Sequence, residues 1–250
     1  MKDHTRLKKW IAALFWIAVW QAAAMALGQG LLLAPPLSVA ARLTTIWRES
    51  GFLSTIWFSF ARILLGFLSA LLLGTVLAVL AGKFPTVEVL LRPLFSAVKT
   101  VPVASFIIIS LIWLSSSQLS QFISFLMVLP IVYTNLLQGI HSTDRKLNEM
   151  AQVFRIPWGR RLLYIWLPQL YPYLLSACSV SLGLSWKSGI AAEVIGIPDG
   201  SIGEMLYQAK AYLNTVDLFA WTVVIVAVSL AFEKSFLALL RRVYGRVTRL

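Results

Sequence analysis

The chain has 250 residues, of which 59% are hydrophobic and only 13% are charged, and its mean hydropathy is +0.80. Because soluble domains are roughly half apolar and a quarter charged, this composition excludes an ordinary soluble protein and predicts an all-α membrane protein with one domain over residues 1–250. The net charge of +12 does not indicate nucleic acid binding, since the basic residues form short clusters between apolar runs. A single cysteine excludes an intrachain disulfide, and no side chains are spaced for catalysis or for metal binding.

Several apolar runs are close to the length of about 20 residues that crosses a hydrocarbon core of about 30 Å. The first run follows Lys8 and Lys9 and extends for about 24 residues, longer than the roughly 7–15 of a signal peptide, so a retained anchor helix is favoured over a cleaved signal. About six transmembrane helices are therefore predicted, at about 10–33, 55–81, 94–114, 119–140, 162–186 and 215–237.

The segments between these runs also predict local structure. After a double proline, Ser38 is expected to cap a short amphipathic helix that ends near Ile46 and lies along the membrane surface. The polar segment 115–118 separates the third and fourth spans, which form either a helical hairpin or a re-entrant pair. Lys99 is expected to reach the cytoplasmic side, and Pro102 is expected to break the helix that follows it.

The distribution of lysine and arginine predicts the orientation in the membrane, because cytoplasmic loops accumulate these residues. If the N-terminus is cytoplasmic, the outer segments contain only Arg42, Arg48, Lys187 and Lys210, while the cytoplasmic segments contain most of the other basic residues. Both termini are therefore assigned to the cytoplasm.

The longest basic cytoplasmic loop, at about residues 141–161, is predicted to contain short helices. Asp144 is placed to cap one that extends to Phe154, and Pro157 either ends that helix or begins another. The residues at helical spacing along it are Leu147, Met150, Ala151 and Phe154. Composition alone leaves two interpretations open, a docking helix or a solvated basic connector with one amphipathic turn.

The same loop resembles the signature of the membrane permeases of binding-protein-dependent ABC importers with the type I fold. That signature is E-A-A, three residues, G, nine residues, then I-x-L-P. Its positions are taken here by Glu149, Met150, Ala151, Arg155, Ile165, Leu167 and Pro168. The spacing is intact, while Met150 replaces an alanine and Arg155 replaces the glycine. The turn Pro157-Trp158-Gly159 is expected to supply the bend that the glycine normally provides.

The resemblance covers roughly residues 33–245 and is nearest to the nitrate, sulfonate and taurine branch of these permeases. Its supporting runs occur in the order found in that branch, at residues 33–38, 59–67, 91–93 with 101–102, and 191–196. The resemblance implies a multi-pass protein of the bacterial inner membrane with a cytoplasmic coupling helix. It also implies a small polar solute, such as a sulfonate, nitrate, taurine or a thiamine-precursor-like heterocycle.

The resemblance further implies partners and contacts. A second copy of the chain, two cytoplasmic ABC ATPase subunits and an extracytoplasmic solute-binding protein are expected. Glu149 is the expected polar contact with the ATPase, and Leu147, Met150 and Phe154 are the expected apolar anchors, as for a helix in a groove. Because Gly82-Lys83 lacks the spacing of a phosphate loop, ATP and Mg²⁺ are expected on the partner ATPase. The chain itself is expected to bind no cofactor and to be no enzyme.

Polar residues within the spans are candidates for the translocation path or its gate. Arg62 is expected either to anchor its helix or to contact the solute. Trp186, Lys187 and Glu193 lie near the end of the fifth span. Lys187 and Glu193 are expected to pair, as a gate or as a plain interfacial ion pair, or Lys187 attracts an anionic solute.

A competing class of function is an ion-coupled secondary transporter or a channel that needs no ATPase. Such a protein predicts an inverted repeat or a run of intramembrane carboxylates. Neither pattern occurs in the sequence. A scaffold without transport activity would need a binding tail or a soluble domain, and both tails are short.

Overall fold

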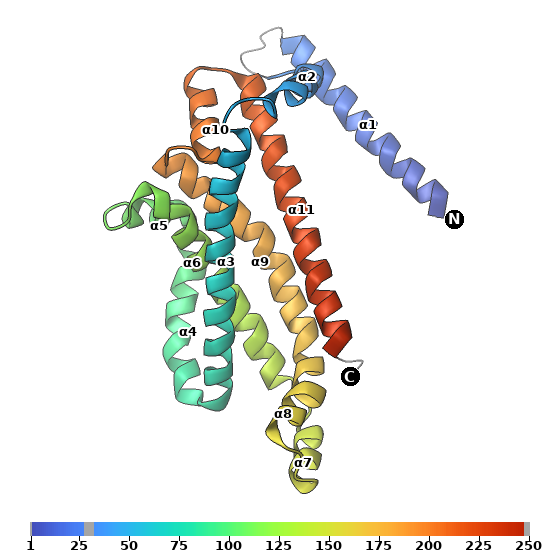
Figure 1. Ribbon diagram of the computed structural model, residues 1–250, viewed down its shortest axis with the longest axis vertical. Helices are drawn as coiled ribbons and strands as arrows, with labels where there is room; N and C mark the ends of the chain where they lie inside the picture. The colour runs from blue at the N-terminus through green and yellow to red at the C-terminus, as the bar shows by residue number, and fades with distance from the viewer. Residues whose placement is uncertain (1, 28–32, 248–250) are drawn as a thin grey trace.

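The computed structural model describes residues 2–27 and 33–247, and these residues form helices and no strands. The elements are α1 (Lys2–Leu27), α2 (Pro36–Ile46), α3 (Phe52–Lys83), α4 (Pro85–Thr100), α5 (Val103–Ser110), α6 (Ser116–His141), α7 (Arg145–Val153), α8 (Trp158–Arg161), the π-helix η1 (Leu162–Trp166), α9 (Leu167–Gly196), α10 (Ile202–Ala211) and α11 (Thr215–Val247). Figure 1 shows the long helices α3, α6, α9 and α11 forming a bundle, with α1 extending away from it. The predicted all-α fold is confirmed.

Among the described residues, α3, α6 and α11 are each long and apolar enough to cross a membrane. They confirm the spans predicted at 55–81, 119–140 and 215–237. The fifth predicted span becomes η1 and α9, and α9 continues ten residues beyond the expected end to Gly196. In α1 the apolar stretch among the described residues is Leu14–Ala26, while the end predicted near residue 33 follows a segment outside the described residues.

The third span, predicted at 94–114, is bent and begins earlier, at Pro85. Helices α4 and α5 meet at an angle of 100°, as a broken span or a re-entrant segment. Val101 is extended, with φ −75° and ψ 132°, and Pro102 follows it. A residue before proline avoids the helical region, and proline lacks the N–H that would continue the ladder, so the chain turns here. The predicted break at Pro102 is confirmed.

Lys99 lies far from the corner between α3 and α4. Helix α4 begins at Pro85, directly after α3 ends, and Lys99 is the second-to-last residue of this 16-residue helix. At 1.5 Å per residue, Lys99 is about 21 Å along the axis from the corner between α3 and α4. With that corner on the cytoplasmic side, as the basic residues predict, Lys99 would be more than halfway across the hydrocarbon core rather than at its cytoplasmic side.

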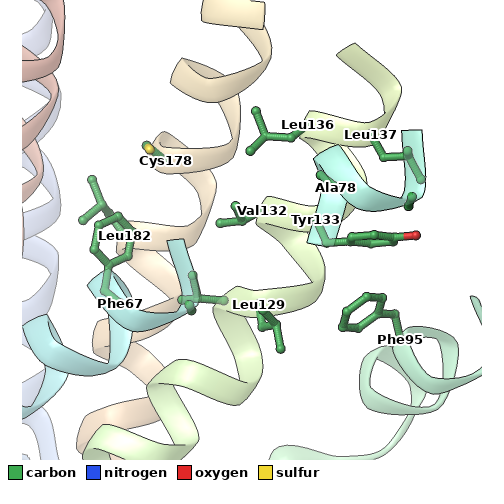
Figure 2. Close-up of a cluster of buried hydrophobic side chains, with 13 residues drawn as sticks. Phe67, Ala78, Phe95, Leu129, Val132, Tyr133, Leu136, Leu137, Cys178 and Leu182 are labelled. Carbon is green, nitrogen blue, oxygen red and sulfur yellow. The ribbon is translucent and has the colours of Figure 1, made fainter. Parts of the chain in front are cut away.

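The core forms where α6 lies between α3 and α9. Figure 2 shows Phe67 of α3 close to Leu182 of α9, and α6 contributes several of the other side chains, among them Leu129, Val132 and Leu136. The rings of Phe95 and Tyr133 have centroids 4.5 Å apart, which fixes α4 against α6. Cys178 is fully buried in the same cluster, as a small core residue.

The end of the bundle that carries α2 and α10 is held by polar contacts. Helix α2 begins after Pro35, so the prediction that Ser38 caps it is wrong, although the helix itself is confirmed. Arg42 of α2 binds Asp217 of α11 and pairs with Glu49 at 2.6 Å. The hydrogen bonds that Arg42 donates, first to Asp217 and then to Glu49, raise the pKa of Arg42 and keep it charged.

Candidate functional site

The loop that contains α7 and α8 projects beyond the rest of the bundle (Figure 1). Asp144 caps α7 as predicted, because its side chain accepts a hydrogen bond of 2.8 Å from the backbone N–H of Lys146. The backbone N–H of Asp144 donates to Oε1 of Gln169 in α9, at 2.7 Å. The start of α7 is therefore tied directly to the first turn of α9.

A second link fastens the middle of α7. Oδ1 of Asn148 accepts hydrogen bonds from Nη2 of Arg161 and from Nε1 of Trp166, both at 2.9 Å. The guanidinium of Arg161 also lies 5.7 Å from the ring centroid of Trp166. The contacts among Asn148, Arg161 and Trp166 were not predicted, because these residue types in a basic loop form no sequence pattern that indicates a contact.

The tip of the loop exposes apolar side chains. Val153 and Phe154 are 78% and 73% exposed. Among the predicted coupling residues, Glu149 has an exposed side chain, and Leu147, Met150 and Phe154 form an exposed group with Val153 and Trp158. We call this group of five apolar residues the loop-tip patch. Several large apolar side chains left exposed on one short segment indicate an interaction site.

Ala151 differs from the other predicted coupling residues. Its side chain is 2% exposed, and its carbonyl accepts a hydrogen bond of 2.9 Å from the N–H of Ile156. A larger residue at this position would push α7 away from the chain that follows it. Ala151 therefore has a packing role beneath the loop-tip patch and no docking surface of its own.

Arg155 itself makes the bend after α7. Its φ is +49°, in the left-handed region that favours glycine. This explains why the related signature has glycine at this position. The expectation that the turn at Gly159 supplies the bend is wrong, because Gly159 lies within α8 and has no positive φ.

The structure does not pair Lys187 with Glu193. Glu193 is fully buried, and its Oε2 accepts hydrogen bonds from Oγ of Ser59 at 2.6 Å and from the N–H of Gly203 at 3.3 Å. Lys187 is exposed on another side of α9. Glu193 therefore joins α9 to α3 and α10, while Lys187 remains directed outward.

The other two predicted path residues lie in the packing of the bundle. Trp186 is 2% exposed and its ring centroid is 6.1 Å from that of Phe60. Arg62 donates from Nε to the carbonyl of Ser117 at 2.5 Å, and its guanidinium lies 3.5 Å from the ring centroid of Phe58. Arg62 thus joins α3 to the start of α6, the anchoring role that the sequence left open.

The long apolar helices of the bundle are those of a multi-pass membrane protein, and the exposed apolar residues of the loop-tip patch indicate an interaction site at one end of it. Residues 70–249 match the family of binding-protein-dependent transport system inner membrane components, and the chain belongs to this family. The family consists of transport permeases, which are not enzymes, and it implies a solute-binding protein and an ATPase as partners in a bacterial inner membrane.

Individual relatives are similar over most of the chain. The taurine transport system permease protein TauC of Escherichia coli is 29% identical over 229 residues, 89% of this chain and 83% of the relative. An aliphatic sulfonates transport permease, SsuC of Bacillus subtilis, so named as a provisional assignment, is 28% identical over 90% of this chain and 82% of its own length. The bicarbonate transport system permease protein CmpB of Synechococcus elongatus is 26% identical over 74% of this chain and 66% of its own length.

Proposed function

We propose that two copies of the chain form the translocation path of an ABC importer for a small polar solute. The solute-binding protein delivers the solute at the outer face, and two ATPase subunits bind at the cytoplasmic face, where both termini lie. ATP and Mg²⁺ are bound by the ATPase subunits. The relatives named for taurine, sulfonate and bicarbonate transport support a solute with an anionic group, such as a sulfonate or nitrate, over a thiamine-precursor-like heterocycle.

One observation carries the proposal, namely the loop-tip patch on a helix held at two points. An amphipathic helix docks in a groove through apolar residues spaced three or four apart. Leu147, Met150 and Phe154 have this spacing on α7 and its C-terminal end, and they are exposed. Glu149 on the same helix is positioned to make a polar contact at the rim of such a groove.

The two links from α7 to α8, η1 and α9 suggest how docking is converted into transport. When the ATPase subunits close on ATP, the loop moves with the groove that holds it. The bonds of Gln169 and Asn148 connect the loop to the start of α9, so the displacement is transmitted to that helix. Alternating access then follows as a rigid shift of α9 and its neighbours.

Among the four candidate path residues, the geometry favours Lys187. It is exposed on α9, a helix that carries the motion, whereas Arg62, Trp186 and Glu193 are engaged in packing or internal hydrogen bonds. Exposing a charged lysine to lipid within the membrane costs free energy, so the side chain needs water or a partner group beside it. A path between two copies of the chain would supply the aqueous surroundings.

The test is a pull-down of the tagged chain from native membranes in mild detergent, with partners identified by mass spectrometry. We expect an ATPase with the wild-type chain and its loss with Phe154→Glu and with Glu149→Arg. The matched control is Tyr212→Glu, an exposed aromatic residue at the opposite end of the bundle, which should retain the ATPase. Recovery of an oligomer with no ATPase from the wild-type chain would overturn the proposal and favour a secondary transporter or channel.

A further inference from the structure

Helix α4 has a polar flank that is distinct from its apolar side. Glu88, Arg92, Ser96 and Lys99 are spaced three or four residues apart, so they lie on one side of the helix. Leu90 and other exposed leucine and valine side chains lie on the opposite side. The apolar side suits lipid, and the polar flank needs different surroundings.

The polar flank of α4 follows a polar edge of α6. At the C-terminal end of α6, Oε2 of Glu88 lies 3.5 Å from Nε2 of His141. At the other end of the polar flank, Nζ of Lys99 donates to Oγ1 of Thr134 at 3.3 Å. Gln138 lies between these two contacts on the same face of α6 and is exposed. We call the groups between Lys99 and His141 the polar seam.

The charge of Lys99 is not neutralised by any carboxylate in the part of the chain that the structure describes. Lys99 is exposed, and among residues 2–27 and 33–247 no carboxylate pairs with it. It lies about 21 Å from the corner of α3 and α4, more than half of a hydrocarbon core of about 30 Å. A lysine at this depth is stable only beside water, a partner group or an anion.

Helix α5 shows that the polar seam and Lys187 are on the same side of the bundle. One apolar cluster joins α5 to Met127 of α6 and to Ala191 of α9. Thr134 lies two helical turns from Met127, and Lys187 lies one turn from Ala191, so both face the side that α5 partly covers.

The depths of the two lysines follow from the register of α6 against α9. Oγ of Ser124 donates to the carbonyl of Ser185 at 2.9 Å, which sets the two helices side by side at that level. Lys187 is therefore about 18 Å farther along α6 than Lys99 and Thr134, toward the end that carries α5. Between these levels, α9 exposes Ser176, Ser179 and the open space at Gly183.

We propose that Lys99 and Thr134 form an anion-binding station in the inner half of the translocation path, in series with Lys187. This inference rests on the proposed function and adds the residue that meets the solute after Lys187. The ammonium of Lys99 donates hydrogen bonds to the oxygens of a sulfonate, nitrate or carboxylate-like group. Thr134, whose hydroxyl donates to the carbonyl of Pro130 at 2.7 Å, accepts from this ammonium and holds it in place. A single lysine binds such an anion weakly enough to release it toward Gln138 and the cytoplasmic end of the polar seam.

Cysteine accessibility tests whether Lys99 faces an aqueous path. In a Cys178→Ala background, Lys99→Cys should react with a charged, membrane-impermeant thiol reagent, and taurine or another transported sulfonate should slow the reaction. Leu90→Cys, which is on the apolar side of the same helix, should remain unreactive. If Lys99→Cys is as unreactive as Leu90→Cys, or if the solute does not slow its reaction, the inference is overturned.

Uptake into proteoliposomes that contain the whole importer tests the role of the charge. Lys99→Met should lower the uptake of an anionic solute about tenfold or more, since it removes a charge-assisted donor, and Lys99→Arg should restore part of it. Lys210→Met, an exposed lysine on α10, is the control and should transport normally. If the Lys99→Met importer takes up solute normally while Lys187→Cys reacts with the thiol reagent, only the anion-binding station at Lys99 is refuted. If the wild-type importer shows no ATP-driven uptake, the proposed function itself is refuted.

Discussion

Oδ1 of Asn148 in α7 accepts a hydrogen bond of 2.9 Å from Nη2 of Arg161, the last residue of α8. A helix that transmits the movement of a partner has to be held stiffly to the element that it moves. The bond from Trp166 of η1 to the same oxygen adds a second constraint, so Asn148 joins the middle of α7 to the two short helices that precede α9.

Asn148→Ala is expected to uncouple ATP hydrolysis from transport. The substitution removes an acceptor shared by two donors, each bond having a net value of about 1 kcal/mol, and leaves α7 tied to α9 only through Asp144 and Gln169. Solute uptake per ATP hydrolysed, measured in proteoliposomes, should fall severalfold while the ATPase still binds. Gln152→Ala, an exposed polar residue on the same helix, is the control. Full coupling in Asn148→Ala would show that the link to α8 carries no motion.

The positive φ of Arg155 predicts an unusual order of stability among variants. Arg155→Gly should be at least as stable as the wild type, because glycine adopts φ +49° without steric cost. Arg155→Val should be destabilised by about 1–2 kcal/mol, since a β-branched side chain is strained there. Thermal unfolding in detergent provides the comparison, with Gly159→Ala as an ordinary helical control. Equal melting temperatures for the glycine and valine variants would contradict the assigned bend.

Gly66 is expected to be indispensable for the packing of α3 on α6. A Cβ at this position would lie 2.3 Å from the backbone carbonyl oxygen of Gln121, which cannot rotate away. Gly66→Ala should therefore lower the melting temperature by several degrees, as overpacking typically costs about 1–3 kcal/mol. Gly183→Ala has open space around its Cβ and should be close to neutral. A similar effect of both substitutions would mean that helix propensity, rather than the close approach, determines the loss.

The sequence predicted those features that depend on local patterns. Long apolar runs gave α3 and α6 to within a few residues, and they gave the start of α11, which continues ten residues beyond its predicted end. Asp144 gave the cap of α7 because capping needs only a side chain and a nearby N–H. The break at Pro102 was also local. Its consequence was not, since the 100° angle between α4 and α5 depends on how Phe95 and Met127 pack against other helices.

The partners of polar side chains could not be predicted, because they come from distant segments. Lys187 and Glu193 are near one another in sequence, yet they lie on different sides of α9 and Glu193 binds Ser59 of α3 instead. Similarly, the distance of Lys99 from the corner between α3 and α4 depends on the start of α4 at Pro85, and the span predicted from residue 94 did not include that start. Tertiary contacts of this kind leave no periodic signal in the sequence.

Ser59 is expected to control the stability of the first turn of α10. Its Oγ accepts a hydrogen bond of 3.0 Å from the N–H of Ile202 and donates one to Glu193, which also accepts from the N–H of Gly203. Two N–H groups at the start of α10, which no helical carbonyl can satisfy, thus depend on side chains of α3 and α9. Ser59→Ala should lower stability by about 1–3 kcal/mol and speed amide hydrogen exchange in α10.

Ser54→Ala is the matched control for Ser59→Ala, because Ser54 is an exposed serine on the same helix whose hydroxyl donates only to the local carbonyl of Gly51. Hydrogen exchange followed by mass spectrometry on peptides covering α10 should therefore accelerate in Ser59→Ala and remain unchanged in Ser54→Ala. If both variants exchange like the wild type, the N–H groups of Ile202 and Gly203 have found other acceptors. The contact between Ser59 and Glu193 would then stabilise the junction of α3 and α9 without holding α10.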